Sequence, residues 1–197
     1  MSQILPWPIA VIDFEASSLD HASYPIEVGL AIWPAPSEPI YSWSTLIRPI
    51  EDWRRHGHWS QAAAKTHGIK GRDLMAHGRD PAWVAAALNA AIKPSTVVWC
   101  DGGPYDTLWA NALFKVAAIA PTFSLGEWHR LTKMLDPQAR DRALEWLTNA
   151  SAPHRARADA ELLLRALMHG LGVDRSTVQD LASRTPLLNM LVTKAEH

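Results

Sequence analysis

Residues 11–19, VIDFEASSL, place two carboxylates in a stretch that otherwise has the pattern of a buried β-strand. Side chains alternate between the two faces of a strand, so Val11, Asp13 and Glu15 share one face, with both acids toward the carboxyl end. An ionised carboxylate that leaves water without a partner is strongly disfavoured. The pair alone fits either a solvated strand end or a binding site, because α/β sheets often bind ligands at the carboxyl ends of their strands.

The composition is that of an ordinary globular protein. The chain has 197 residues, 48% of them hydrophobic and 20% charged, with a formal net charge of −1. This size suits one domain spanning residues 1–197. The charge is neither that of a strongly basic nucleic-acid binder nor that of a disordered acidic chain. A nucleic-acid substrate is still compatible with it, since a local basic surface is enough to attract one.

The sequence gives no sign of export or of a membrane segment. The N-terminus lacks a basic region followed by an apolar run. No apolar stretch approaches the roughly 20 residues that cross a bilayer. The single cysteine, Cys100, excludes an internal disulfide framework and a cysteine-based zinc site. We therefore expect a soluble, cytoplasmic protein.

The pattern of the chain favours an α/β domain. Five stretches are predicted as strands: 9–17, 25–33, 41–50, 95–101 and 122–125. Helical spacing dominates the remainder from residue 58 onward. Three strands followed by alternating helices and strands indicate a mixed sheet flanked by helices. The C-terminal helical segment, about 174–197, is expected either to pack on the domain or to form a homodimer contact.

Asp106 is the third acid in an unexpected place. Pro104 suits the first position of a helix, which puts Asp106 in the first turn. An acid there can simply complement the helix dipole, worth about 0.3–1 kcal/mol. However, Trp109, Ala110 and Leu113 follow it at helical spacing, so it points along an apolar stripe.

Asp159 is the fourth acid. Ala156 precedes it by three residues and Leu163 follows it by four, so it lies on the core face of a helix. A lone acid on that face would be either an error or a functional residue.

Divalent cations would explain all four acids. Two like charges 4 Å apart repel by ~4 kcal/mol at an effective dielectric constant near 20. Together the four carboxylates carry about −4, close to the charge of two divalent ions, and all-carboxylate oxygen ligation suits Mg²⁺ or Mn²⁺. Two such ions side by side are typical of phosphoryl transfer.

His154 supplies a candidate proton acceptor. It lies five residues before Asp159, most simply in the loop that precedes the helix and beside the ions. Histidine can accept a proton from water near neutral pH. The alternative is an incidental surface histidine, one of nine in the chain.

These motifs together resemble the DEDDh 3′–5′ exonuclease superfamily, which includes polymerase proofreading exonucleases, ribonuclease T and oligoribonuclease. The resemblance rests on the D-x-E of Asp13 and Glu15, on Asp106 after a strand, and on the H-x-A-x-x-D that ends at Asp159. The stretch YPIEVGLA is similar to the family's second strand, and AAAKTHGIKGRDL to its His-Gly-Ile segment. The resemblance covers about residues 9–168 in the right order.

The resemblance implies a fold, a reaction and a set of site residues. The fold would be ribonuclease-H-like, an α/β architecture with a five-stranded mixed sheet flanked by helices. Two divalent cations, Mg²⁺ or Mn²⁺, would be bound by four residues: Asp13, Glu15, Asp106 and Asp159. His154 would deprotonate the attacking water, and nucleoside 5′-monophosphates would leave from the 3′ end of single-stranded DNA or RNA. The terminal nucleotide would be held by Ala16, Ser17 and Leu19.

Two stretches depart from the family pattern. Ala16-Ser17-Ser18 stands where many members have Thr-Thr-Gly or Thr-Gly, and Asp101-Gly102-Gly103 stands where an Asn often occurs. All five catalytic positions are present, so the departures affect the grip on the 3′ end and the sugar preference. Two alternatives remain open: a non-catalytic nucleic-acid-binding module that retains the fold, and another ribonuclease-H-like enzyme such as an endonuclease.

Overall fold

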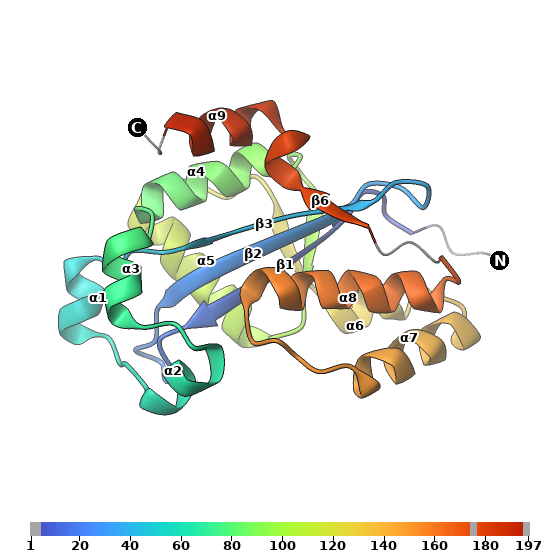
Figure 1. The fold of residues 1–197 in the computed structure, drawn as a ribbon, viewed down its shortest axis with the longest axis horizontal. Coiled ribbons are helices and arrows are strands. Elements are labelled where there is room, and N and C mark those ends of the chain that lie inside the picture. The colour runs from blue at the N-terminus through green and yellow to red at the C-terminus, as the bar shows by residue number, and fades with distance from the viewer. Residues whose placement is uncertain (1–4, 174–176, 195–197) are drawn as a thin grey trace.

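The computed structural model describes residues 5–173 and 177–194 around one mixed β-sheet (Figure 1). The strand order is β5-β4-β1-β2-β3-β6. The central strand β1 (Ile9–Ala16) pairs antiparallel with β2 (Pro25–Trp33), which pairs antiparallel with β3 (Ile40–Leu46). On the other side, β4 (Val97–Cys100) and β5 (Ser124–Glu127) continue parallel to β1. The predicted α/β class, a mixed sheet flanked by helices, is confirmed.

The sheet has six strands where the sequence predicted five. The additional strand β6 (Val178–Asp180) pairs parallel with β3 and is followed by a 3₁₀ turn (Leu181–Ser183) and by α9 (Pro186–Lys194). The segment about 174–197 is therefore only partly helical, and residues 174–176 and 195–197 lie outside the described part. A strand of three residues is too short to show an alternating pattern, which is why the sequence did not indicate it.

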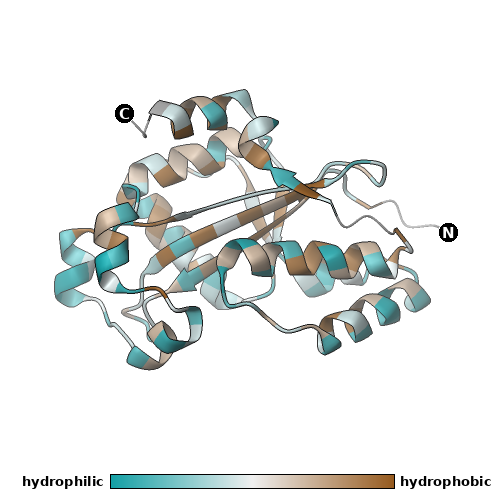
Figure 2. Ribbon diagram, in the orientation of Figure 1, coloured by the Kyte–Doolittle hydropathy of each residue, from teal (hydrophilic) through white to brown (hydrophobic). Residues whose placement is uncertain are grey.

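Two layers of helices cover the sheet. The even-numbered face of β1 packs with α4 (Pro81–Ala91), α5 (Pro104–Ala117) and α9. The odd-numbered face packs with α6 (Trp128–Thr132), α7 (Pro137–Asn149) and α8 (Ala156–Gly170). Figure 2 shows the central strands in mainly apolar colours and polar residues on the outer sides of the helices. Because β1 is buried on both faces, its first half is a continuous apolar run.

The carboxyl end of β1 leads into a region of short helices. These helices are α1 (Glu51–His56), α2 (Gln61–His67) and α3 (Gly71–His77), grouped at one end of the sheet (Figure 1). The N–H of Ser60 donates to the carbonyl of Ser17 over 2.8 Å, which ties the start of α2 to the loop after β1. One wall of the space beyond the strand end is therefore built from α2.

The start of α8 rests directly on β2. A Cβ atom added to Gly29 would lie 2.1 Å from the carbonyl carbon of Ala156, so only glycine permits this approach. The contact brings the first turn of α8 to the same edge of the sheet as the carboxyl ends of β1 and β4. Among the helices of residues 5–173 and 177–194, none combines the length and the apolar character of a bilayer span.

Candidate active site

Five carboxylates converge at this edge of the sheet. Two sets of three acids each have carboxylate oxygens within 4.8 Å of one another: Asp13 with Glu15 and Asp159, and Asp13 with Asp101 and Asp106. The structure thus brings together all four acids that the sequence singled out and adds Asp101. Parallel pairing of β1 and β4 explains the second set, because the chain leaves both strands at the same edge.

Asp106, in the second set, is buried against the loop that follows β4. Asp106 is 1% exposed, and its Oδ2 accepts a hydrogen bond from the N–H of Gly102 over 2.9 Å. A Cβ on Gly102 would come within 2.6 Å of that oxygen, so the loop after β4 needs glycine there. The neighbouring Asp101 is exposed and sits at the mouth of the site.

One carboxylate oxygen of Asp159 has no protein partner. Its Oδ2 accepts from the N–H of Arg155 over 2.8 Å, while its Oδ1 is buried and lacks any hydrogen bond within the described structure. Buried polar atoms are nearly always paired in native proteins. An acceptor without a partner, in the set with Asp13 and Glu15, is suited to bind a cation.

The electrostatics of the site are those of crowded acids. Burial, and then the charges of neighbouring acids, hold the pKa of Asp13 well above its ordinary value. Burial, followed by Asp159 and Glu27, raises the pKa of Glu15 to about 7. Burial also raises the pKa of Asp106 to about 6, against the opposing effect of the Gly102 hydrogen bond. A bound cation would reverse these effects by favouring the charged carboxylates.

The donor set fits hard divalent cations. Within the described residues, none of the five carboxylates forms an ion pair with a basic side chain. All available ligands are oxygens, as Mg²⁺ and Mn²⁺ prefer. Because Asp13 belongs to both sets, it is placed to be shared between two ions.

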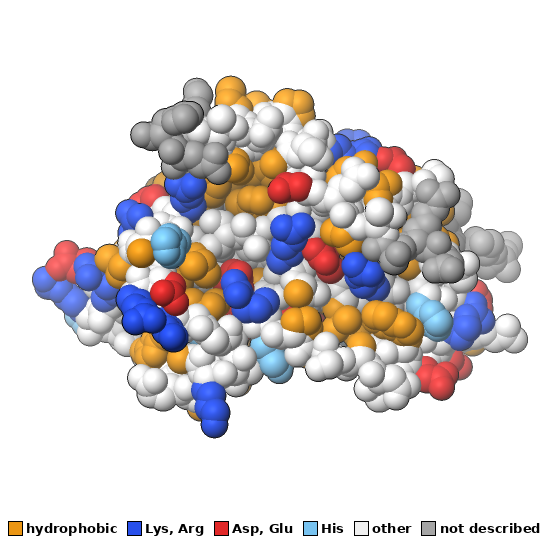
Figure 3. All heavy atoms as spheres, viewed as in Figure 1, with side chains coloured by type: hydrophobic (Ala, Val, Ile, Leu, Met, Phe, Trp, Pro, Cys, Tyr) orange, Lys and Arg blue, Asp and Glu red, His pale blue; other side chains and the backbone are white. Residues whose placement is uncertain are grey.

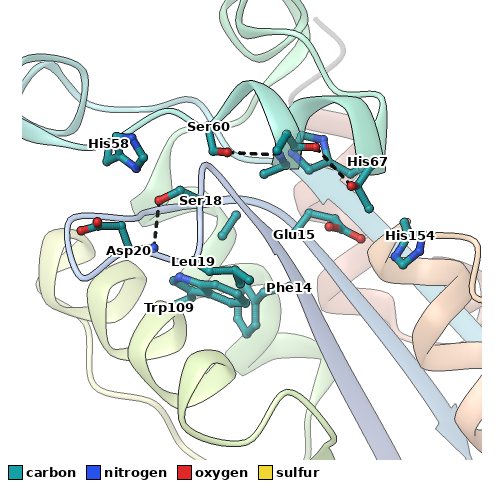
Figure 4. A pocket seen from close by; sticks show the side chains of 14 residues that line it. Phe14, Glu15, Ser18, Leu19, Asp20, His58, Ser60, His67, Trp109 and His154 are labelled. Carbon is teal, nitrogen blue, oxygen red and sulfur yellow. Dashed lines mark hydrogen bonds between the residues drawn. The ribbon is translucent and has the colours of Figure 1, made fainter.

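His154 lies between two hollows of the surface. The first, of about 400 Å³, is lined by the five acids and by apolar residues that include Leu147 and Leu162. The second, of about 630 Å³, lies between the loop after β1 and α2. Figure 4 shows the side chains of Glu15 and His154 pointing toward one another at the border. The exposed His154 is thus beside the acids, in the loop before α8, where the sequence predicted it.

The residues expected to hold the terminal nucleotide are only partly gathered. Ala16 and Leu19 line the second hollow, and Leu19 is 68% exposed. Ser17 does not line it: its side chain is fully buried, and its Oγ accepts from the N–H of Tyr24 over 3.0 Å. A register shift in the β1–β2 pairing between Glu15 and Ala16 breaks the alternation there. The resemblance that implied Ser17 as a nucleotide contact carries no information on this irregularity of the strand.

The second hollow contains further residues that the sequence did not assign to a site. Phe14 and Trp109 form apolar walls, and Ser60, Thr66 and His67 come from α2 and its N-cap (Figure 4). The spacing of Trp109 indicated a core residue, and it is indeed 6% exposed, yet part of its ring faces both hollows. A residue can satisfy a core pattern and still supply a wall of a pocket.

Comparisons with known proteins support the fold. No protein-family model matches the sequence, and neither does any curated protein. Among solved structures, a moderately thermophilic exonuclease I from Methylocaldum szegediense is similar over 95% of this chain, with a TM-score of 0.57 and 16% sequence identity. The chain spans 43% of the length of that protein. At this identity the likeness concerns architecture, and it agrees with the ribonuclease-H-like fold.

Proposed function

We propose that this chain is a divalent-metal-dependent 3′–5′ exonuclease that acts on single-stranded nucleic acid from a single catalytic domain, residues 1–197. The observation that carries the proposal is the pair of carboxylate sets sharing Asp13, with His154 at their border. The ribonuclease-H-like fold, shared with a protein described as an exonuclease I, is consistent with it.

The acids would divide between two ions, Mg²⁺ or Mn²⁺. Glu15 and Asp159 would hold one, Asp101 and Asp106 the other, and Asp13 would contact both. Two ions held by these residues would supply positive charge for the attacking and leaving oxygens of a phosphodiester. The remaining work falls to the protein: His154 accepts a proton from the water, and its place outside the ligand set leaves its ring free to do so.

The second hollow suits the terminal nucleotide. Its volume, about 630 Å³, is within the range of small-ligand sites. Phe14, Leu19 and Trp109 offer apolar and aromatic surface, and stacking of a base on an aromatic ring is worth about 1–3 kcal/mol. Ser60 and Thr66 also line this hollow, and their hydroxyl groups offer hydrogen-bonding atoms to the sugar or the base edge.

The surface around the site carries mixed charge. Figure 3 shows Lys and Arg side chains spread over the face that holds α2, α3 and α8, with acidic side chains between them. Such a face favours a few local phosphate contacts rather than a long basic track. Short single strands, engaged mainly at their 3′ end, are the substrates that it suits best.

Digestion of 5′-labelled single strands tests the proposal. Matched RNA and DNA oligonucleotides are incubated with Mg²⁺, with Mn²⁺ or with EDTA and resolved on denaturing gels, and D13N purified in parallel controls for contaminating nucleases. We expect a metal-dependent ladder that shortens from the 3′ end and is absent with D13N. Comparison of the digestion rates of the RNA and DNA strands gives the sugar preference.

Other outcomes of the same assay favour the alternatives. Binding of single strands without release of mononucleotides in Mn²⁺ would support a non-catalytic module. Cleavage of circular single strands would support an endonuclease.

A further inference from the structure

The first turn of α8 is fastened to β2 by one buried carboxylate. The side chain of Glu27 is 3% exposed. Its Oε2 accepts from Nε of Arg155 over 2.9 Å, and its Oε1 accepts from a terminal nitrogen of the same guanidinium over 2.7 Å. Oε2 also accepts from the N–H of Ala156 over 3.2 Å. A two-pronged contact of this kind fixes orientation as well as distance.

Arg155 is held at both of its ends. While its guanidinium is bound to Glu27, its N–H donates to Oδ2 of Asp159 over 2.8 Å. The absence of a Cβ at Gly29 lets the backbone of Ala156 lie against β2 beside this contact. Arg155, the N-cap residue of α8, therefore has little freedom to shift.

His154 directly precedes Arg155 and has an unusual backbone conformation. Its φ of +53° lies in the left-handed region, which a residue other than glycine keeps only when its surroundings require it. Its exposed side chain makes no hydrogen bond within the described residues. The adjacent residue Arg155, which is held by Glu27 and Asp159, therefore restrains the backbone of His154.

We propose that Glu27 is a positioning residue for catalysis, acting through Arg155 to hold His154 beside the ion-binding acids. This inference rests on the proposed function, because it gives Glu27 a role in the step that His154 performs. The location supports it: Glu27 lies opposite Glu15 in the register of β1 and β2, so the fastening point adjoins an ion-binding acid.

A double-mutant cycle separates this role from a merely structural one. We expect E27Q to lower kcat on the order of 10–10²-fold, since misplacement by about 1 Å can cost that much. The KM and the Mn²⁺ affinity measured by isothermal titration should stay within about threefold. In an H154A background, E27Q should lower kcat by less than about threefold, because the group being positioned is gone.

The matched control is E161Q. Glu161 also pairs with an arginine of α8, Arg157 at 3.0 Å, and with Ser42 of β3, but it lines neither of the two hollows that His154 borders. We expect E161Q to keep kcat within about threefold of the wild type. If E27Q fails to fold, R155K takes its place in the cycle, because lysine keeps the charge and loses the two-pronged contact.

The outcomes distinguish the two proposals. An equal loss of kcat from E27Q in both backgrounds, or a matching fall in Mn²⁺ affinity, would overturn the positioning role and leave the exonuclease proposal standing. A wild-type protein that releases no mononucleotides in Mn²⁺ would overturn both.

Discussion

Glu15 and Glu27 lie opposite each other on neighbouring strands, yet their surroundings are opposite in character. Glu15 faces other acids, and burial together with their charges raises its pKa to about 7. Glu27 is more deeply buried, but it accepts hydrogen bonds from the guanidinium of Arg155 and from the N–H of Ala156.

This difference distinguishes the acids of the candidate site from Glu27, which stabilises the structure around them. Glu27 has partners supplied by Arg155 and Ala156, whereas none of the five acids of the site forms an ion pair with a basic side chain of the described residues. Unpaired acids that gather in one place, beside a buried acid that is fully paired, are typical of a functional site. A cation would balance the five acids of the site, whereas Glu27 already has its partners within the protein.

Removing an unpaired acid should have the largest effect on turnover. We expect Asp13→Ala and Asp159→Ala each to reduce metal-dependent nucleotide release to the assay background, because Asp13 belongs to both carboxylate sets and Asp159 carries the buried oxygen without a partner. Circular dichroism should show an intact fold. Near-normal activity in either variant would refute the metal assignment.

His154→Ala should be next in size. Loss of a general base lowers the rate by about 10²–10⁴-fold. Mn²⁺ binding, followed by calorimetry, should be retained, because His154 lies outside the ligand set. A decrease in kcat of less than tenfold would remove His154 from this role.

Neutralising the two kinds of acid should change stability in opposite directions. E27Q leaves Arg155 without its carboxylate, and because that guanidinium is half exposed we expect the free energy of unfolding to fall by only about 1–3 kcal/mol. In metal-free buffer at pH 8, D13N should raise it by about 1 kcal/mol by relieving repulsion. Urea denaturation in EDTA measures the free energy of unfolding of both variants. Changes of the same sign would show that Glu27 and Asp13 do not differ in their effect on stability.

The pH dependence of the metal-free protein should show the smallest effect. Glu15 and Asp106 have pKa values raised to about 7 and about 6, above 4.5 and 3.8. The folded state therefore binds more protons than the unfolded state between about pH 4 and 7, and stability falls as the pH rises through that window.

Because solvent screens this edge, we expect a loss of about 1 kcal/mol, or about 2–4 °C in Tm, between pH 5 and pH 8 in EDTA. Saturating Mn²⁺ should abolish the loss. A metal-free Tm that rises over this range would mean that the acids are not crowded in solution.

The sequence was sufficient for features that depend on local pattern. The buried strand at 9–16, the acids on one of its faces and the helix start at Pro104 all follow from alternation, apolar spacing and proline. The convergence of Asp13 with Asp106 follows from the rule that parallel strands end at one edge.

The features it missed depend on contacts distant in sequence. Asp101 lies in an exposed turn with no burial pattern to draw attention to it, and only its place after β4 brings it to Asp13. The partners Glu27 and Arg155 are 128 residues apart. The inward turn of Ser17 follows from a bulge, which no periodicity indicates.

The short strand β6 has a consequence for handling the protein. It pairs with Ile40–Ser42 of β3, and Arg184 then stacks on Tyr41 at 4.8 Å and pairs with Glu38. Without this cover, backbone donors and acceptors of β3 would form an open template for a second chain. A truncation before residue 177 would therefore expose the edge of β3 and promote self-association, although every acid of the site would remain.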